Sequence, residues 1–247
     1  MKVEAGTFWN REGALEVPEQ PRRALAISAH PDDTEFGCAG TAALWTRQGW
    51  EFYYLILTNG NKGSDDPEMT PEKLAPIRQQ EQRAAAAVLG VKDVFFLGYE
   101  DGELTYSRQL LGEVVRYIRQ IRPYAVFTAD PESIIVRDSF INHSDHRCAG
   151  LVAVDAVYPA ARDRWNFHEQ IEEGLEPHKV SELYIWSFDK ANFSVDISEV
   201  IDLKLEALSQ HRSQFGDNPE FLGYIRERWR DEKGRHVEPF RRIVMMR

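Results

Sequence analysis

Short apolar runs alternate with amphipathic segments along most of this chain, and this alternation constrains its fold more than any other feature. The apolar runs have the length of β-strands, while the segments between them show helical spacing of apolar residues. The predicted strands are residues 23–28, 51–58, 94–97, 125–128 and 182–188, and the predicted helices are residues 41–49, 71–89, 107–121, 149–160, 198–213 and 218–231. Strands joined through helices pair in parallel, so we predict an α/β fold. In this fold, a three-layer Rossmann-like sandwich, helices cover a mostly parallel central sheet.

The 247 residues contain no linker that would separate two domains. We therefore expect a single domain over residues 1–247. Residues 1–20 are polar with scattered apolar positions and are expected to form a loose arm or an edge strand. Residues 159–180 carry two prolines and many charges, which is typical of a lid or a contact surface.

Charge and composition exclude several classes of protein. The 30 basic and 40 acidic residues give a net charge of −10, so we expect no general affinity for nucleic acid or anionic membranes. No apolar run approaches the roughly 18 residues of a membrane span, and the first residues do not resemble a signal peptide. Two cysteines, Cys38 and Cys148, build no disulfide framework, which suits a cytoplasmic protein.

A cluster of polar side chains ends the first predicted strand. The sequence Ala29-His30-Pro31-Asp32-Asp33 places one imidazole and two carboxylates within four residues, and the proline discourages continuation of the strand. In open α/β sheets, ligands bind at the carboxyl ends of the strands. The alternative interpretation is a plain turn, because Pro-Asp-Asp is favourable turn chemistry.

A second cluster, Asn142-His143-Ser144-Asp145-His146, follows the fourth predicted strand. If strands 1 and 4 are neighbours at the switch point of the sheet, the two clusters meet there. Together they supply more than the three protein ligands of a mononuclear metal site that keeps an open position for water. Residues that do not bind the metal would remain as an acid or base for hydrolysis. Alone, the second cluster can also be an exposed helix start, and the nearby cysteines remain candidate soft ligands.

Both clusters resemble signatures of the PIG-L/LmbE-like deacetylases, which are zinc hydrolases of N-acetylglucosamine-type substrates. Residues 29–33 are similar to the AHPDD signature of this family, and residues 143–146 are similar to its HxDH signature, with Ser144 where proline is common. The similarity continues through the following segments: Thr58–Gly63, Arg78–Val91, Phe96–Leu104, and Lys204 with His211–Gln214. The resemblance covers about residues 22–216 and implies a metal site at the carboxyl ends of strands 1 and 4.

The resemblance also implies a role for each residue of the site. The metal ligands would be His30, Asp33 and His146. Asp32 would be the general base that takes a proton from the water activated by the metal, and His143 would stabilise the tetrahedral oxyanion. Arg78 and Asp130 occupy positions where the family has substrate-binding residues. The expected cofactor is Zn²⁺, with another divalent transition metal as the alternative.

We therefore predict a zinc-dependent N-deacetylase that hydrolyses the acetamide of an N-acetylglucosamine-type sugar or conjugate. Its partner would be that small molecule, and the resemblance implies a homo-oligomer, a trimer or a hexamer. Trp165 and Phe167 are expected either to form a sugar-stacking rim or to pack in a core or interface. The rival hypotheses are a metal-dependent phosphoesterase, which would favour two metal ions, and a non-catalytic sugar- or nucleotide-binding module.

Overall fold

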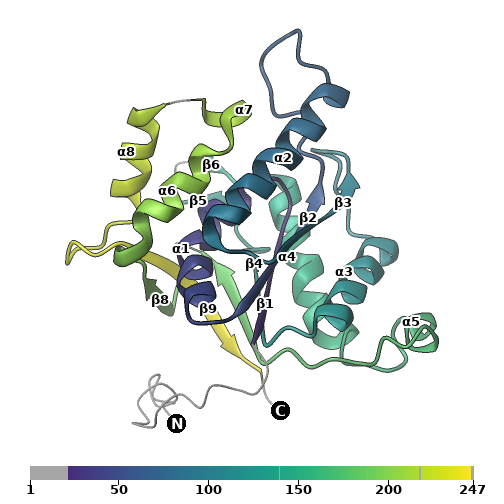
Figure 1. Ribbon diagram of the computed structural model, residues 1–247. Helices are drawn as coiled ribbons and strands as arrows, with labels where there is room; N and C mark the ends of the chain where they lie inside the picture. Colours follow the sequence, from purple (N-terminus) through teal and green to yellow (C-terminus); the bar gives the residue numbers. More distant parts are fainter. Residues whose placement is uncertain (1–21, 139, 188, 217, 246–247) are drawn as a thin grey trace.

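The computed structural model describes residues 22–138, 140–187, 189–216 and 218–245. Within these residues, a seven-stranded sheet has the strand order β3-β2-β1-β4-β7-β9-β8 (Figure 1). The strands are β1 (Arg23–Ser28), β2 (Glu51–Thr58), β3 (Asp93–Tyr99), β4 (Ala125–Ala129), β7 (Glu182–Trp186), β8 (Phe193–Asp196) and β9 (Val237–Val244). The first five are parallel, and β9 is antiparallel to both of its neighbours. The expected mostly parallel sheet is confirmed, while the interpretation of residues 1–20 lies outside the described residues.

Helices cover both faces of the sheet, which confirms the three-layer architecture (Figure 1). One face carries α1 (Asp33–Arg47), α2 (Pro71–Leu89), α6 (Ile201–Ser209) and α8 (Pro219–Arg228). The other face carries α3 (Arg108–Ile121), α4 (Ser144–Asp155) and the π-helical turn η1 (Ala156–Ala160). The short elements are a hairpin of β5 (Ile135–Val136) and β6 (Phe140–Ile141), α5 (His168–Glu172), η2 (Ser198–Val200) and α7 (Arg212–Phe215). None of the helices in these residues is long and apolar enough to cross a membrane.

Burial on both faces explains why the strands read as continuous apolar runs. In β1, Ala24 and Ala26 pack into the core beneath α1, whereas Leu25 and Ile27 pack into the core beneath α3 and α4. Successive side chains of a strand point to opposite faces, so a strand covered on both sides needs apolar residues at every position. The prediction of the parallel strands was based on these continuous apolar runs.

The first helix begins earlier than predicted. We expected a helix from residue 41, but α1 begins at Asp33, includes Gly37 and Gly40, and contains a kink at Cys38. Glycine occurs at both positions because neighbouring side chains pack directly against the backbone of the helix. A Cβ atom would lie 2.5 Å from the Trp186 ring at Gly37 and 2.6 Å from Ile197 at Gly40. The sequence alone does not reveal these long-range contacts.

The two antiparallel strands β8 and β9 were not predicted. The apolar pattern of β9 is interrupted by charged residues, so the sequence does not read as a strand. One of these residues, Glu238, is buried in an ion pair. The fifth predicted strand is correct but ends at Trp186, two residues earlier than expected. The prediction of a single domain over residues 1–247 stays a prediction.

Residues 159–180 pack along helix α3, and the end of this segment lies beside the amino-terminal end of β4. His178 contacts the carbonyl of Pro123, which precedes β4, and Arg119 of α3 donates to the carbonyls of Ala160 and Asn166. Phe167 is buried against α3, so its predicted packing role is confirmed and the sugar-stacking alternative is wrong for this residue. Trp165 is exposed and stacks on His168.

Candidate metal centre and adjoining cavity

The two polar clusters meet at the carboxyl edge of the sheet. Strand β1 pairs directly with β4, so the residues after β1 and the start of α4 lie side by side although more than 100 positions separate them in the sequence. The ring of His30 lies 4.8 Å from that of His143 and 5.1 Å from that of His146, measured between centroids. The predicted neighbourhood of strands 1 and 4 is therefore correct.

Three side chains from these clusters bring their ligand atoms together. Nδ1 of His30 lies 3.2 Å from Nε2 of His146 and 3.6 Å from Oδ2 of Asp33, and Nε2 of His146 lies 3.0 Å from Oδ1 of Asp33. Tetrahedral ligands with metal bonds of about 2.0–2.1 Å are separated by roughly 3.3–3.4 Å. The three residues thus have the spacing of a mononuclear metal site.

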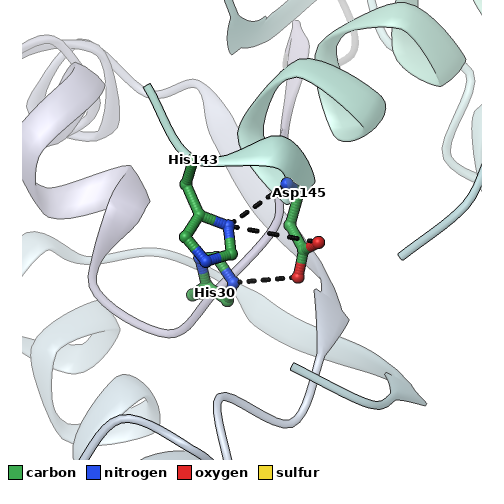
Figure 2. A group of neighbouring side chains, drawn as sticks. All are labelled: His30, His143 and Asp145. Atoms are coloured by element: carbon green, nitrogen blue, oxygen red, sulfur yellow. Dashed lines mark hydrogen bonds and ion pairs between the residues drawn. The ribbon is translucent and has the colours of Figure 1, made fainter. Parts of the chain in front are cut away.

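Hydrogen bonds on the far side of each ring orient these ligands. Nε2 of His30 lies 3.0 Å from Asp101 and 3.2 Å from Asp145 (Figure 2), and Nδ1 of His146 lies 3.0 Å from Oδ1 of Asn142. A ring nitrogen that faces an acceptor donates its proton to it, so in its neutral form each ring turns a lone pair toward the other. The two nitrogen lone pairs and the Asp33 carboxylate can therefore coordinate one cation between them.

The charge balance at His30 supports the same conclusion. Burial lowers the pKa of this imidazole, but hydrogen bonds to Asp101, Asp145 and Asp33 outweigh the burial and raise the pKa to about 12. The position therefore strongly favours a positive charge, which a proton or a metal ion can supply. A ligand set of two imidazoles and one carboxylate suits zinc and several other divalent transition metals.

A second group of candidate ligands, formed by His30, His143 and Asp145, is already engaged in hydrogen bonds (Figure 2). His143 is the N-cap of α4, and its Nδ1 accepts from the backbone N–H of Asp145 at 3.2 Å. Asp145 accepts from the backbone N–H groups of Gly102 and Leu104 and contacts His30. This group therefore serves to orient His30 and His143 rather than to hold a second ion.

His143 is placed to act as a neutral hydrogen-bond donor. Its Nδ1 is occupied as an acceptor, so its ring proton is on Nε2. Burial and the nearby positive charge of His30 lower the pKa of His143, which keeps the ring neutral at pH 7. The side chain is 44% exposed, so a substrate can reach it.

Asp32 is held in an unusual backbone conformation beside the ligands. Its φ of 100° lies in the left-handed region, which costs a non-glycine residue about 1–3 kcal/mol and is typical of functional sites. Its backbone N–H donates to Oε1 of Gln82 at 2.8 Å, and its carboxylate lies 3.0 Å from the guanidinium of Arg78. Burial raises the pKa of Asp32 to about 6, against the opposing effect of Arg78. A carboxylate with this pKa is suited to general-base chemistry near neutral pH.

The structure places the two predicted substrate-binding residues in different surroundings. Arg78 is buried and donates to the carbonyls of Gly60 and Pro31 as well as to Asp32. Asp130 lines a cavity and accepts from Ser187 Oγ at 3.0 Å. A role in substrate binding stays a prediction for both residues.

Three residues with a role in the site were not identified from the sequence. Gln82 holds the backbone of Asp32, Asp101 orients His30, and Asn142 orients His146. Asp101 lies in a segment that resembles the family, and Gln82 follows Arg78 by one helical turn, but neither fact predicts a partner. Neither cysteine belongs to a group of candidate ligands among the described residues, so the soft-ligand alternative has no support.

A cavity of about 230 Å³ adjoins the metal ligands. Asp33 and His146 line one end of it, and Asn142 and Asp130 lie beside them. Its other walls are mostly apolar and come from α1, β7, β9, the β5–β6 hairpin and the end of α8: Phe36, Val136, Phe140, Trp186, Trp229 and Pro239.

Comparison with known proteins identifies related sequences and structures. A family model described as GlcNAc-PI de-N-acetylase (PIG-L) matches residues 25–157. The diacetylchitobiose deacetylase of Thermococcus kodakarensis is 36% identical over 197 residues, which cover 80% of this chain and 72% of that protein. A probable N-acetyl-α-D-glucosaminyl L-malate deacetylase 2 of Bacillus anthracis is 28% identical, over 78% of this chain and 82% of that protein.

A solved structure is also similar to this chain over most of its length. The N,N′-diacetylchitobiose deacetylase from Pyrococcus horikoshii, complexed with its inhibitor MPG, superimposes with a TM-score of 0.82 at 32% identity. The match covers 93% of this chain and 87% of that one. The similarity therefore extends beyond the two clusters to the sheet and the helices that position them.

Proposed function

Because this chain belongs to the PIG-L family of LmbE-like deacetylases, and is thus a hydrolase of N-acetyl amide bonds, we propose that it removes acetyl groups from N-acetylglucosamine-type sugars with the help of a zinc ion. The named relatives act on diacetylchitobiose and, in the probable assignment, on a GlcNAc–malate conjugate. Their common chemical unit is an acetamide on a glucosamine ring. The proposed substrate class is therefore a small molecule that carries this unit.

One observation carries the proposal. The ligand atoms of His30, His146 and Asp33 lie within 3.6 Å of one another. Asp32 and His143 lie beside them and do not belong to this ligand set. A zinc ion held by these three residues supplies a Lewis acid that polarises the amide carbonyl and acidifies a water molecule. The protein supplies the proton transfers and the hydrogen bonds to the developing charge.

Asp32 and His143 divide these tasks. Asp32 accepts a proton from the attacking water, a role that suits a buried carboxylate with a pKa of about 6. His143 donates a hydrogen bond from Nε2 to the oxyanion of the tetrahedral species. The C–N bond then breaks, and the amine leaves with the proton that Asp32 accepted. Arg78 and Gln82 hold Asp32 in position for both transfers.

The rival hypotheses have less support. A phosphoesterase with two metal ions would need a second free group of ligands, whereas the second group among the described residues shares His30 and uses His143 and Asp145 in hydrogen bonds. Family membership as an amide hydrolase argues against a non-catalytic binding module. A trimeric or hexameric assembly and a cytoplasmic location stay predictions.

The Asp32→Asn variant tests the assignment of the general base. Asparagine tolerates the left-handed backbone conformation at this position but cannot accept the proton, so we expect kcat for acetate release to fall by about 10²–10⁴-fold. Zinc content should remain one ion per chain. Acetate release from N-acetylglucosamine and diacetylchitobiose, together with metal analysis of the purified protein, measures both.

The exposed Asp202→Asn variant on α6 is the matched control and should keep full activity. If Asp32→Asn loses zinc together with activity, Asp32 is a ligand and the division of roles between the two aspartates is wrong. If the wild-type protein loaded with zinc releases no acetate from any N-acetylated amino sugar, the proposed function itself is wrong.

A further inference from the structure

The surroundings of the candidate ligands differ in chemistry. Three charged side chains beside the candidate ligands do not line the cavity: Asp32, its partner Arg78, and Asp101, which contacts His30. The cavity begins at Asp33 and His146 and continues between aromatic and aliphatic walls. A substrate amide at the metal has a polar sugar on its nitrogen and an apolar acyl group on its carbonyl carbon. The chemical match assigns the sugar to the charged side chains and the acyl group to the cavity.

Helix α1 connects the cavity directly to the metal ligands. Asp33 and Gly37 are four residues apart, so they lie on the same face of the helix, and Phe36 borders the cavity beside them. The absence of a Cβ at Gly37 allows the Trp186 indole to pack against the helix and close one wall. The same turn of helix that supplies a metal ligand therefore also shapes the cavity.

Asp130, Ser187 and Asn142 of the cavity wall are paired within the protein, while Arg228 adds a charged side chain to the wall. Asp130 accepts from Ser187 Oγ and from the backbone N–H of Glu132. Asn142 donates to the carbonyl of Ser133 and contacts Nδ1 of His146. Sugar hydroxyls need hydrogen-bond partners when they are buried, whereas an alkyl or aryl group does not. The pairing therefore favours an apolar occupant.

The cavity is much larger than an acetyl group requires. A methyl group is comparable in size to a water molecule, whose share of liquid volume is about 30 Å³, whereas this cavity has about 230 Å³. An apolar cavity of about 150 Å³ is sufficient to bind benzene. A short alkyl chain or one aromatic ring fits the space beside the ligands.

We propose that the cavity is an acyl-binding site and that this enzyme hydrolyses N-acyl amino sugars whose acyl group is larger than acetyl, from butyryl to benzoyl. The inference rests on the proposed function and specifies its substrate class. The reaction is the same hydrolysis: water adds to the acyl carbon, the C–N bond breaks, and a carboxylate and an ammonium group are released. Only the occupant of the cavity changes.

A series of substrates that differ in the acyl group alone tests the proposal. The zinc-loaded enzyme is assayed for release of amine from N-acetyl, N-butyryl and N-benzoyl derivatives of one sugar, the one that gives most acetate in the assay above. Each methylene that enters the cavity should raise kcat/KM about fourfold, so the butyryl substrate, with two more methylenes, should exceed the acetyl substrate by about 15-fold. Hydrolysis of the acetyl substrate alone overturns the acyl-site inference and leaves the proposed function standing, whereas failure of the whole series overturns both.

Two neighbouring residues of the hairpin give a matched pair of variants. Val136 lines the cavity and is 8% exposed, whereas Ile135 is 59% exposed on the same strand. Val136→Trp fills the cavity and should lower the ratio of butyryl to acetyl kcat/KM at least tenfold, while Ile135→Trp should leave the ratio unchanged. Phe140→Ala, at a half-exposed position, enlarges the cavity and should raise the benzoyl rate relative to the acetyl rate. An unchanged ratio in folded Val136→Trp and Phe140→Ala overturns the location of the acyl site.

Product binding gives a readout that is independent of turnover. Butyrate should bind the zinc-loaded protein more tightly than acetate in calorimetry, with a more negative heat-capacity change because apolar surface is buried. Val136→Trp should remove this difference, whereas Ile135→Trp should keep it. Equal affinity of both carboxylates for the wild-type protein would contradict an apolar site beside the metal.

Discussion

At the scale of single residues, the proposed metal centre includes side chains that orient the candidate ligands without belonging to the ligand set. Asn142 is the clearest example. Its Nδ2 donates to the carbonyl of Ser133 at 2.8 Å, which leaves Oδ1 to face Nδ1 of His146. The ring of His146 then turns Nε2 toward Asp33 and His30. Such partners fix the tautomer of a ligand and increase its affinity for metal.

Replacement of Asn142 by alanine should therefore weaken zinc binding by about 10–100-fold, because Nδ1 of His146 loses its acceptor. Competition with a chromophoric chelator measures this affinity without reference to turnover. Asn142→Asp keeps an acceptor at the same place and should restore most of the affinity. Asn192→Ala, at an exposed asparagine of the sheet edge, is the control. Wild-type affinity in Asn142→Ala would show that His146 needs no orienting partner.

At the scale of elements, the antiparallel edge of the sheet is fixed by one buried carboxylate. Glu182, the first residue of β7, accepts two hydrogen bonds from Arg242 of β9 and others from Tyr124 and Tyr184. Burial opposes its ionisation, but these donors outweigh the burial and hold the pKa of Glu182 below its usual value of 4.5. The ionised carboxylate therefore stabilises the pairing of β7 with β9.

A group whose pKa is depressed by folding stabilises the protein above its unfolded pKa, and this contribution is lost as the pH falls. Glu182→Gln should lower the free energy of unfolding by about 1–3 kcal/mol at pH 7, since it weakens charged hydrogen bonds in a buried place. The difference from wild type should shrink as the pH falls below 4.5, because the Glu182 carboxylate then gains a proton in the unfolded chain before it does so in the folded protein. Urea unfolding between pH 7 and 3.5 measures this difference in the free energy of unfolding. The exposed Glu199→Gln variant is the control. A constant difference across this range would contradict the assignment.

At the scale of the whole molecule, a buried ion pair between α6 and β9 anchors helix α1 through hydrogen bonds to its backbone. Glu238 of β9 contacts Nζ of Lys204 at 2.7 Å and accepts from the backbone N–H groups of Gly40 and Thr41 in α1. Lys204 also donates to the carbonyls of Glu35 and Phe36. Helix α1 begins with the proposed metal ligand Asp33, so this pair fixes the helix that positions Asp33 and borders the cavity.

Glu238→Gln should destabilise the fold by about 3–5 kcal/mol, because Lys204 would remain charged in a fully buried place without its counter-charge. Lys204→Met combined with Glu238→Gln removes the unpaired charge and should recover part of the loss. Thermal and urea unfolding of both single variants and of the double variant form the required cycle. If the double variant loses as much stability as the sum of the single variants, the two residues are not energetically coupled.

The sequence by itself determined the parallel strands and most of the covering helices, and it showed that polar residues of the proposed metal centre stand at the ends of strands. These features follow from local patterns: apolar runs mark strands that are buried on both faces, and His30, Asp32 and Asp33 stand where the first strand ends. The similarity to a family then predicted a role for each residue of the two clusters, and these roles stay predictions until variants are measured.

Only the tertiary structure decided which residues orient the ligands and what lies beside them. Gln82, Asp101 and Asn142 act through partners that sequence spacing does not indicate. Strand β9 was missed because its charged residues, among them buried Glu238, find partners far away in the chain. The cavity is likewise formed by Phe36, Trp186 and Trp229, which meet only after folding. A pattern along the chain records which residues are apolar, whereas the shape between them depends on contacts that only the folded chain creates.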